Sequence, residues 1–451
     1  MADMPMNLDR RSFLTASAAA LAAPAALAAP LSRYGLDAGT FGVRPGAPDD
    51  QSRVLQRAID QAARTRAPLM LAPGVYRAGN LKLPAGTNLS GVRGATTLTL
   101  TRGPSLAAAD HADTISLTGL IFDGSGQTLP DGSGLVHLSG TRKLRIAECE
   151  ILRAGGNGIA LDGCDGEVTH TTIADSADTA LFSRDGRGLM ITGNIVRRSG
   201  NGGIRVWQSD KRDDGSTIAD NRIEDTDARA GGSGQNGNAI NVFRANNVIV
   251  RGNHIRGAAF SAIRGNAASN IQIIGNNCSA LEEVALYAEF GFEGAVIADN
   301  IVDGAGIGVS VTNFNEGGRL ATVRGNIIRN VAARRPGTPP EDDGIGIAVE
   351  ADTTVSGNTI ENATNAGITA GWGKYLRNVA ITGNVVRMAG YGIAVSVAVG
   401  AGEAVITSNM IAGAKRGAIV GMEMRKVVTG DLAKESAERY PQLKIADNQV
   451  N

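Results

Sequence analysis

The sequence is poor in cysteine, histidine and aromatic residues, and its charges cancel. Its 451 residues include 3 cysteines, 4 histidines and 4% aromatic residues, with 44 basic residues against 44 acidic ones. Three cysteines without a C-x-x-C pair argue against a thiolate metal cluster or a disulfide framework. The histidines have no ligand spacing, and the acidic runs at residues 213–214 and 341–343 read as solvated loops rather than Ca²⁺ sites. A net charge of zero provides no electrostatic field that would attract nucleic acid. We expect no cofactor, no metal ion and no nucleic-acid partner.

Long apolar runs are also missing beyond the N-terminus, so no membrane span is expected in the mature chain. The N-terminal residues contain Arg10 and Arg11, an alanine-rich apolar run and an A-x-A site at residues 26–28. This arrangement resembles a twin-arginine (Tat) export signal. The resemblance implies the Tat machinery as a partner and a periplasmic or secreted location. It predicts a signal peptide over residues 1–28 and a single domain over residues 29–451.

Glycine, by contrast, is abundant at 60 residues, and it marks a repeat. An asparagine preceded by glycine, aspartate or serine recurs at intervals of 23 to 32 residues, at Asn194, Asn221, Asn253, Asn276, Asn300, Asn326, Asn358, Asn384 and Asn409. A period in the twenties with short strands predicts a solenoid, in which each turn buries its apolar face against its neighbours. About a dozen turns are expected.

Each repeat follows the pattern V-x-x-N-x-I, then a glycine turn, then G-I-x-V. Strand alternation predicts that Val250, Asn253, Ile255 and Ile263 point inward and that Arg264 points outward. An inward asparagine can donate and accept hydrogen bonds along the stack, so these asparagines are expected to be structural. Glycine precedes the asparagine because the bend is expected to need a φ that other residues resist.

Residues 41–91 and the repeats resemble the right-handed parallel β-helix of the pectate lyase-like superfamily, over nearly all of residues 34–451. The resemblance implies an all-β fold whose N-terminal cap, about residues 34–100, contains an amphipathic helix with an apolar face of Val54, Leu55, Ala58, Ile59 and Ala62. A C-terminal cap is expected over about residues 421–451. Within it, residues 429–442 predict a short helix that stops at Pro441.

The twin-arginine signal together with the repeats also resembles the uncharacterised Tat-translocated repeat proteins, a group that implies no activity. Polygalacturonase-like members of the superfamily carry N-T-D, D-D, G-H-G and R-I-K in successive turns, and this series is missing. The D-P-H of alginate epimerases and the W-x-D-H of classical pectate lyases are missing too. Fold alone cannot supply an activity.

The outward positions of the G-I-x-V strands predict a surface that we call the strip. Stacked about 4.8 Å apart, it consists of Arg205, Trp207, Asn241, Phe243, Arg264, Asn266, Tyr287 and Glu289. In later turns the same positions hold small residues, namely Gly308, Ala348, Thr369 and Ala394. Insertions at residues 227–237 and 333–344, and the segment 209–215, are expected to wall the strip. Because aromatic faces pack on sugar rings and guanidiniums bind carboxylates, we predict a polysaccharide site.

Within the strip, Arg205, Trp207, Asn241, Phe243 and Asn266 are the predicted substrate-binding residues. The predicted catalytic residues are Arg264, Tyr287 and Glu289.

Two mechanisms stay open. In a lyase, Arg264 or Arg205 would neutralise a uronate while Tyr287 or a second arginine removes the C5 proton. In a hydrolase, Glu289 would need a second carboxylate, for which Asp210 is the nearest candidate by register. The alternative is a non-catalytic cell-envelope scaffold or binding solenoid.

Overall fold

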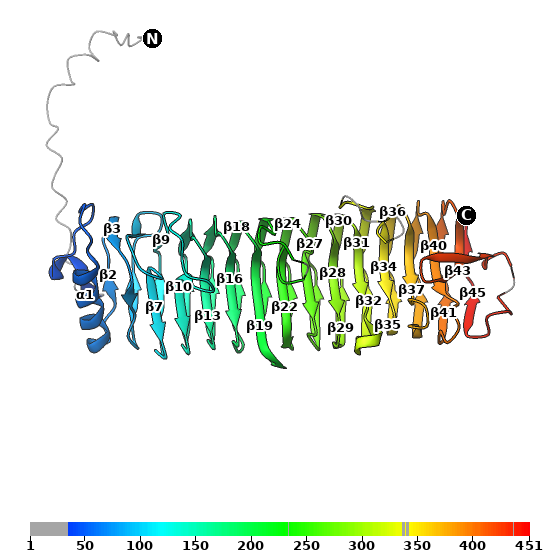
Figure 1. Ribbon diagram of the computed structural model, residues 1–451, viewed down its shortest axis with the longest axis horizontal. Coiled ribbons are helices and arrows are strands. Elements are labelled where there is room, and N and C mark those ends of the chain that lie inside the picture. Colours follow the sequence, from blue (N-terminus) through cyan, green and yellow to red (C-terminus); the bar gives the residue numbers. More distant parts are fainter. Residues whose placement is uncertain (1–34, 233, 336–338, 340–341, 436) are drawn as a thin grey trace, which may run out of the picture.

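The computed structural model describes residues 35–232, 234–335, 339, 342–435 and 437–451. The predicted export signal lies outside these residues. Within them the chain forms one long parallel β-helix (Figure 1). The all-β solenoid predicted from the asparagine period is therefore confirmed.

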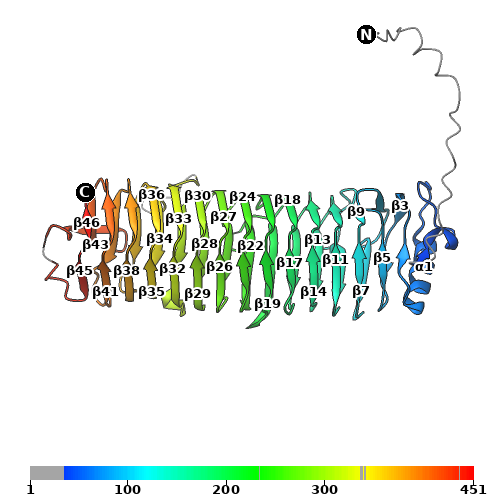
Figure 2. The same cartoon turned by 180° about the vertical axis from the view of Figure 1, so that it is seen from behind.

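The strands form three sheets of 16, 15 and 15 strands, which run the length of the molecule (Figure 2). The first sheet begins with β1 (Leu36–Asp37) and ends with β45 (Leu443–Ala446), and the third begins with β3 (Gly74–Ala78) and ends with β46 (Gln449–Val450). The second sheet, which carries the predicted strip, consists in spatial order of β4 (Leu81–Lys82), β7 (Ala107–Asp110), β10 (Gly134–Ser139), β13 (Asn157–Asp162), β16 (Thr179–Arg184), β19 (Gly202–Asp213), β22 (Asn238–Asn246), β25 (Ile263–Asn266), β28 (Val284–Glu289), β31 (Ile307–Val311), β34 (Ile345–Val349), β37 (Ala366–Ala370), β40 (Tyr391–Ser396), β43 (Gly417–Glu423) and β44 (Lys426–Asp431).

The core is a stack of aliphatic side chains, one layer per turn. Val250, Ile255 and Ile263 are buried, as their alternation predicts. Val250 pairs in register with Ile273 of the next turn, so like side chains lie directly over one another. Each turn therefore buries its apolar face only when its neighbours are present.

The inward asparagines form a continuous hydrogen-bonded ladder. The backbone N–H and the Nδ2 of Asn194 both donate to Oδ1 of Asn221, at 2.9 and 3.0 Å. The same pair of bonds repeats from each asparagine to the next as far as Asn409, which donates to Asn448. Their predicted structural role is confirmed, and Asn448 extends the series by one member.

The bend before each asparagine needs a left-handed backbone, as predicted. Gly252, which precedes Asn253, has a φ of 64°. Where glycine is replaced by aspartate, as at Asp220, the φ is still 57°. Glycine adopts this region without strain, and aspartate tolerates it better than most residues.

Helix α1 (Ser52–Thr65) lies at the N-terminal end of the solenoid (Figure 1). It buries Leu55, Ala58, Ile59 and Ala62 against the first turns, and Val54 packs at the edge of the same cluster. The predicted N-terminal capping helix is therefore confirmed. No helix in the described part of the chain has both the length and the apolar character needed to cross a membrane.

The C-terminal end differs from the prediction, because the described residues between 429 and 442 contain no helix. Instead, β44 pairs antiparallel with β43 and covers the edge of the second sheet. The carboxylate of Asp431 accepts hydrogen bonds from the backbone N–H groups of Ala418 and Ile419, at 3.0 and 3.1 Å. Pairing with the sheet edge therefore takes residues 429–431 out of the predicted helix.

Candidate functional site

The predicted strip lies on the second sheet in the expected register. Arg205 pairs with Asn241, and the same row continues through Arg264 to Tyr287. A second row, two residues further along each strand, runs through Trp207, Phe243, Asn266 and Glu289. The structure therefore brings all eight residues together, and their roles in binding or catalysis stay predictions.

Half of the strip is buried, which the sequence did not indicate. Arg205 and Asn241 are buried, Arg264 is 7% exposed and Glu289 is 2% exposed. The described part of the insertion at residues 227–237, which was expected to wall the strip, folds over part of it. The Nδ2 of Asn241 donates to the carbonyl of Gly234 at 2.7 Å. The strip was predicted as an accessible surface, and for Arg264 that expectation is wrong.

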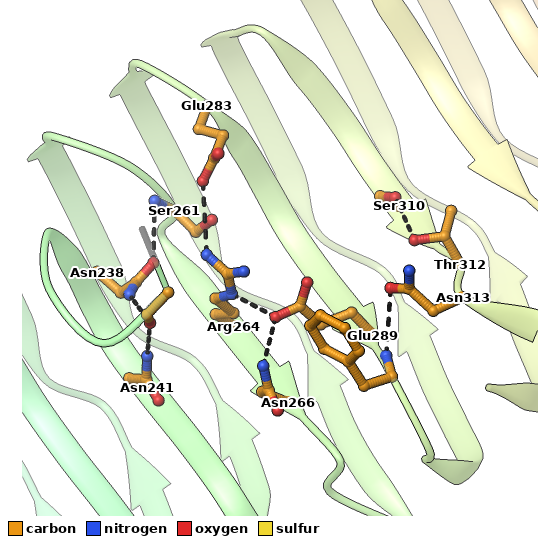
Figure 3. A network of polar contacts seen from close by, with 12 residues as sticks. Asn238, Asn241, Ser261, Arg264, Asn266, Glu283, Glu289, Ser310, Thr312 and Asn313 are labelled. Carbon is orange, nitrogen blue, oxygen red and sulfur yellow. Dashed lines mark hydrogen bonds and ion pairs between the residues drawn. The ribbon is translucent and has the colours of Figure 1, made fainter. Parts of the chain in front are cut away.

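Arg264 lies in a buried cluster of opposite charges (Figure 3). Its Nε donates to Oε1 of Glu289 at 2.6 Å, and its Nη1 lies 3.7 Å from Oε2 of Glu283. The Nδ2 of Asn266 donates to the same Glu289 oxygen at 2.7 Å. Burial alone would lower the pKa of Arg264, but these two carboxylates outweigh it and raise that pKa. In the lyase scheme Arg264 could thus act only as a cation, never as a base.

Tyr287 lies beside this cluster, with its ring 5.1 Å from the guanidinium carbon of Arg264. Burial raises the pKa of Tyr287, the charge of Glu289 raises it further, and a hydrogen bond with Thr312 opposes the rise. The phenol therefore keeps its proton at neutral pH. This state suits a hydrogen-bond donor and disfavours the role of proton acceptor.

Glu289 and Asp210 do not form a hydrolase pair in this arrangement. Asp210 lies on β19 and Glu289 on β28, three strands further along the second sheet. Three strand spacings amount to about 14 Å, whereas the two carboxyls of a glycosidase lie about 5 to 9.5 Å apart.

The aromatic part of the strip forms a compact group of rings. Trp207 packs edge to face against Phe182 and Phe243, with ring centroids 5.1 and 5.6 Å apart. Its Nε1 donates to Oδ1 of Asn241 at 3.0 Å. Trp207 and Phe243 are half-buried, so they keep some accessible ring surface.

An open cleft lies further along the same sheet, where the sequence predicted a featureless surface. It has a volume of about 820 Å³ and begins at Tyr287. Its floor continues the row of Tyr287 through Ser310, Ala348 and Thr369. Ser310 occupies the place in this row that Gly308 was expected to fill. Because these floor residues are small, the space above β31, β34 and β37 stays open.

Two groups of side chains border the cleft. One comes from the chain segments that precede the strands of the second sheet and contains Glu283, Arg335, Asp342 and Asp343. The other follows the strands and contains Asn313, Glu350, Trp372 and Tyr375. Trp372 is 38% exposed.

The cleft contains two buried carboxyls. Asp343 is 5% exposed and Glu350 is 9% exposed. Burial raises the pKa of both, although Arg335 opposes this at Asp343 and the backbone N–H of Phe314 opposes it at Glu350. Within the described part of the chain, Oδ2 of Asp343 is buried and has no hydrogen-bond partner.

Sequence reasoning missed the aromatic border of this cleft. Trp372 is one of only two tryptophans, in the segment GWGKYL that directly follows β37. Residues 209–215 were predicted to wall the strip because they follow a strand of the second sheet, and residues 371–376 follow β37 in the same way. The signal in the sequence was therefore a tryptophan and a tyrosine directly after a strand of this sheet.

A second groove, of about 730 Å³, lies beside the chain segments that lead from the third sheet to the second. Its charged side chains largely neutralise one another, as in the pair Arg198–Asp175 at 2.6 Å and the pair Arg229–Asp227 at 3.1 Å. The described residues that line it include no aromatic side chain. The cleft on the second sheet is therefore the better candidate for a binding site.

Comparison with known proteins agrees with the fold. Residues 111–223, 157–317 and 212–377 match the family model described as the right handed beta helix region. A search of curated proteins finds no match.

Solved structures also resemble this chain. The N-terminal fragment of bacteriophage phi29 gene product 12 is 15% identical, with a TM-score of 0.55 over 87% of this chain and 69% of that one. The A-module of mannuronan C-5 epimerase AlgE6 from Azotobacter vinelandii is 14% identical, with a TM-score of 0.46 over 92% of this chain and 99% of that one. The Streptococcus pneumoniae surface protein and adhesin PfbA is 12% identical, with a TM-score of 0.44 over 92% and 97%. At such identities the likeness concerns the fold alone.

Proposed function

The chain belongs to the right-handed β-helix family, and we propose that it uses this scaffold to bind a polysaccharide in the cleft over β31, β34 and β37. The observation that carries the proposal is the exposed Trp372 beside Tyr375, above a floor of small polar and apolar residues. Aromatic rings offer rigid apolar faces with a polar edge, which suit the face of a sugar ring. The polar groups of Asn313, Ser310 and Thr369 can hydrogen-bond to hydroxyls.

Recognition is better supported than cleavage. The predicted catalytic residues Arg264 and Glu289 are paired with each other and buried, and the pKa of Tyr287 is raised. A lyase built on them would need to expose the ion pair and to deprotonate the phenol. The non-catalytic binding solenoid is therefore the preferred form of the proposal, with lyase or hydrolase activity as its alternative.

Replacing Trp372 with alanine should weaken polysaccharide binding by about tenfold or more, because it removes the most exposed aromatic ring of the cleft, which Arg425 covers on one side. Stability should change by less than about 1 kcal/mol, since the ring is not part of the core. Affinity electrophoresis against a panel of soluble neutral and uronate-containing polysaccharides, with a thermal melt of each variant, would measure both effects.

The matched control for this experiment is Phe290→Ala. Phe290 is 40% exposed and does not line the cleft, so its loss should leave binding unchanged. Equal binding by the wild type and by Trp372→Ala would remove the cleft from the proposal. An ultraviolet-absorbing unsaturated product in the same assays would favour the lyase alternative.

We also propose that the chain is exported by the Tat pathway, on the strength of Arg10, Arg11 and the A-x-A site at residues 26–28. Replacing both arginines with lysine should retain the protein in the cytoplasm with residues 1–28 uncleaved. Cell fractionation and the intact mass of the recovered protein would measure this. Unchanged export of the double variant would contradict the proposal.

A further inference from the structure

The charges that line the cleft are unequal in number. The described residues there include four carboxyls, of Glu283, Asp342, Asp343 and Glu350, but only two guanidiniums, of Arg335 and Arg425. Arg335 lies 3.3 Å from Glu283, and Arg425 forms an ion pair with Asp342. Among these described residues, each guanidinium is therefore already ion-paired with one carboxyl, although the Nε of Arg335 is buried without a hydrogen-bond partner. Two of the described carboxyls are left without an ion pair of their own, and Arg335 acts on one of them, Asp343, only through its charge.

The two remaining carboxyls, of Asp343 and Glu350, lie at opposite ends of one strand. Asp343 precedes β34 and Glu350 directly follows it, so that they border the floor of the cleft on its two sides. Glu350 accepts a hydrogen bond from the backbone N–H of Phe314 at 2.7 Å. The unpartnered Oδ2 of Asp343, buried at the cleft wall, is the kind of atom that a ligand hydroxyl or a water satisfies.

Resting on the proposed function, we propose that the cleft selects an uncharged polysaccharide and rejects uronate-rich chains, with Asp343 and Glu350 as the specificity-determining carboxyls. A uronate carboxylate in the cleft would lose its hydration and meet no free cation, and its approach to either carboxylate would be repulsive. A sugar hydroxyl can donate to an ionised carboxyl and accept from a protonated one. A neutral sugar is therefore accepted in both protonation states, whereas repulsion of a uronate requires the ionised carboxylates.

The distance between Asp343 and Glu350 also indicates whether the two carboxyls can cleave a glycosidic bond. Asp343 and Glu350 are seven positions apart, with the five extended residues of β34 between them. That length of extended chain corresponds to roughly 20 Å, well beyond the carboxyl spacing of a glycosidase, about 5 to 9.5 Å. The two carboxyls therefore orient a ligand from both sides without forming an acid and base pair.

The test measures binding of the purified protein to named probes by isothermal titration calorimetry. The neutral probes are mixed-linkage β-glucan, galactomannan and dextran, and the uronate probes are polygalacturonate and alginate. We expect at least one neutral probe to bind about tenfold or more tightly than either uronate. Neutral binding should also be insensitive to salt, because no ionic contact forms.

Two substitutions identify the carboxyls responsible. Asp343→Asn together with Glu350→Gln keeps the shape of both side chains and removes their charge, so that discrimination against polygalacturonate should fall by about tenfold. The matched control is Glu361→Gln, because the side chain of Glu361 is 45% exposed, lies on the third sheet and pairs with Arg387 at 2.8 Å. A thermal melt of each variant confirms folding.

Each outcome decides between the two proposals. Tighter binding of a uronate probe than of every neutral probe would overturn the selectivity and leave polysaccharide recognition in place. Unchanged discrimination in the double variant would remove Asp343 and Glu350 from the selectivity. Absence of binding to all five probes would overturn the proposed function itself and this inference with it.

Discussion

Replacing Arg264 with alanine is expected to destabilise the protein by about 3 to 5 kcal/mol, the usual cost of breaking a buried ion pair from one side. The substitution would leave Glu289, which is 2% exposed, without its guanidinium partner at 2.6 Å. The amide of Asn266 would remain as a hydrogen-bond donor, but an amide does not neutralise a charge. Urea unfolding followed by circular dichroism, with wild type and variant under the same conditions, would measure the change.

A matched control distinguishes the stability lost through burial of the charge from the stability lost by breaking an ion pair. Arg387 and Glu361 form an exposed ion pair at 2.8 Å on the third sheet, and Arg387→Ala should cost less than about 1 kcal/mol. Replacing both members of the buried pair, as in Arg264→Met with Glu289→Leu, should recover much of the loss, because no charge is then left buried. Equal costs for Arg264→Ala and Arg387→Ala would contradict the burial of this pair.

Replacing Asn276 with alanine is expected to cost about 2 to 4 kcal/mol, because it interrupts the asparagine ladder in the middle. Oδ1 of Asn276 accepts from both the backbone N–H and the Nδ2 of Asn253, at 3.0 and 2.9 Å. Its own Nδ2 donates to the carbonyl of Val250 at 3.1 Å. Without the side chain, the buried N–H of Asn253 has no acceptor. Leaving a buried donor without an acceptor costs more free energy than the hydrogen bond contributed.

The neighbouring residue provides the control for this ladder. Asn277 directly follows Asn276 but points outward and is exposed, so Asn277→Ala should change stability by less than about 0.5 kcal/mol. Hydrogen exchange should locate the effect of Asn276→Ala in the adjoining turns, because a solenoid is held together by contacts between neighbours. Equal destabilisation by both substitutions would show that the ladder adds nothing to stability.

The candidate site could be predicted only in part from sequence. Strand alternation placed Arg205, Trp207, Arg264 and Tyr287 in their correct rows, because register in a parallel stack follows from the repeat itself. Their burial could not be predicted, since it depends on how the insertion at residues 227–237 folds back over them. An insertion lies outside the sequence repeat, and its conformation depends on the surface against which it packs.

The sequence by itself determined the solenoid, because the same few signals are repeated in every turn. An aliphatic pattern of period two, a glycine or aspartate at the left-handed bend and an inward asparagine each specify one turn, and neighbouring turns confirm one another. The capping helix α1 was implied by the family resemblance, and one face of its 14 residues is apolar, as that resemblance led us to expect. Tertiary structure alone decided the C-terminal cap, where pairing of β44 with β43 replaced a predicted helix.

Tertiary structure alone also decided the cleft. Glu283, Asp343 and Trp372 come from three different turns and lie around one space only because the solenoid stacks those turns about 4.8 Å apart. None belongs to the repeated pattern, so no period in the sequence marks them. The repeat fixes the backbone because its signals are local and recur, whereas the site arises from single residues that meet only after the chain has coiled.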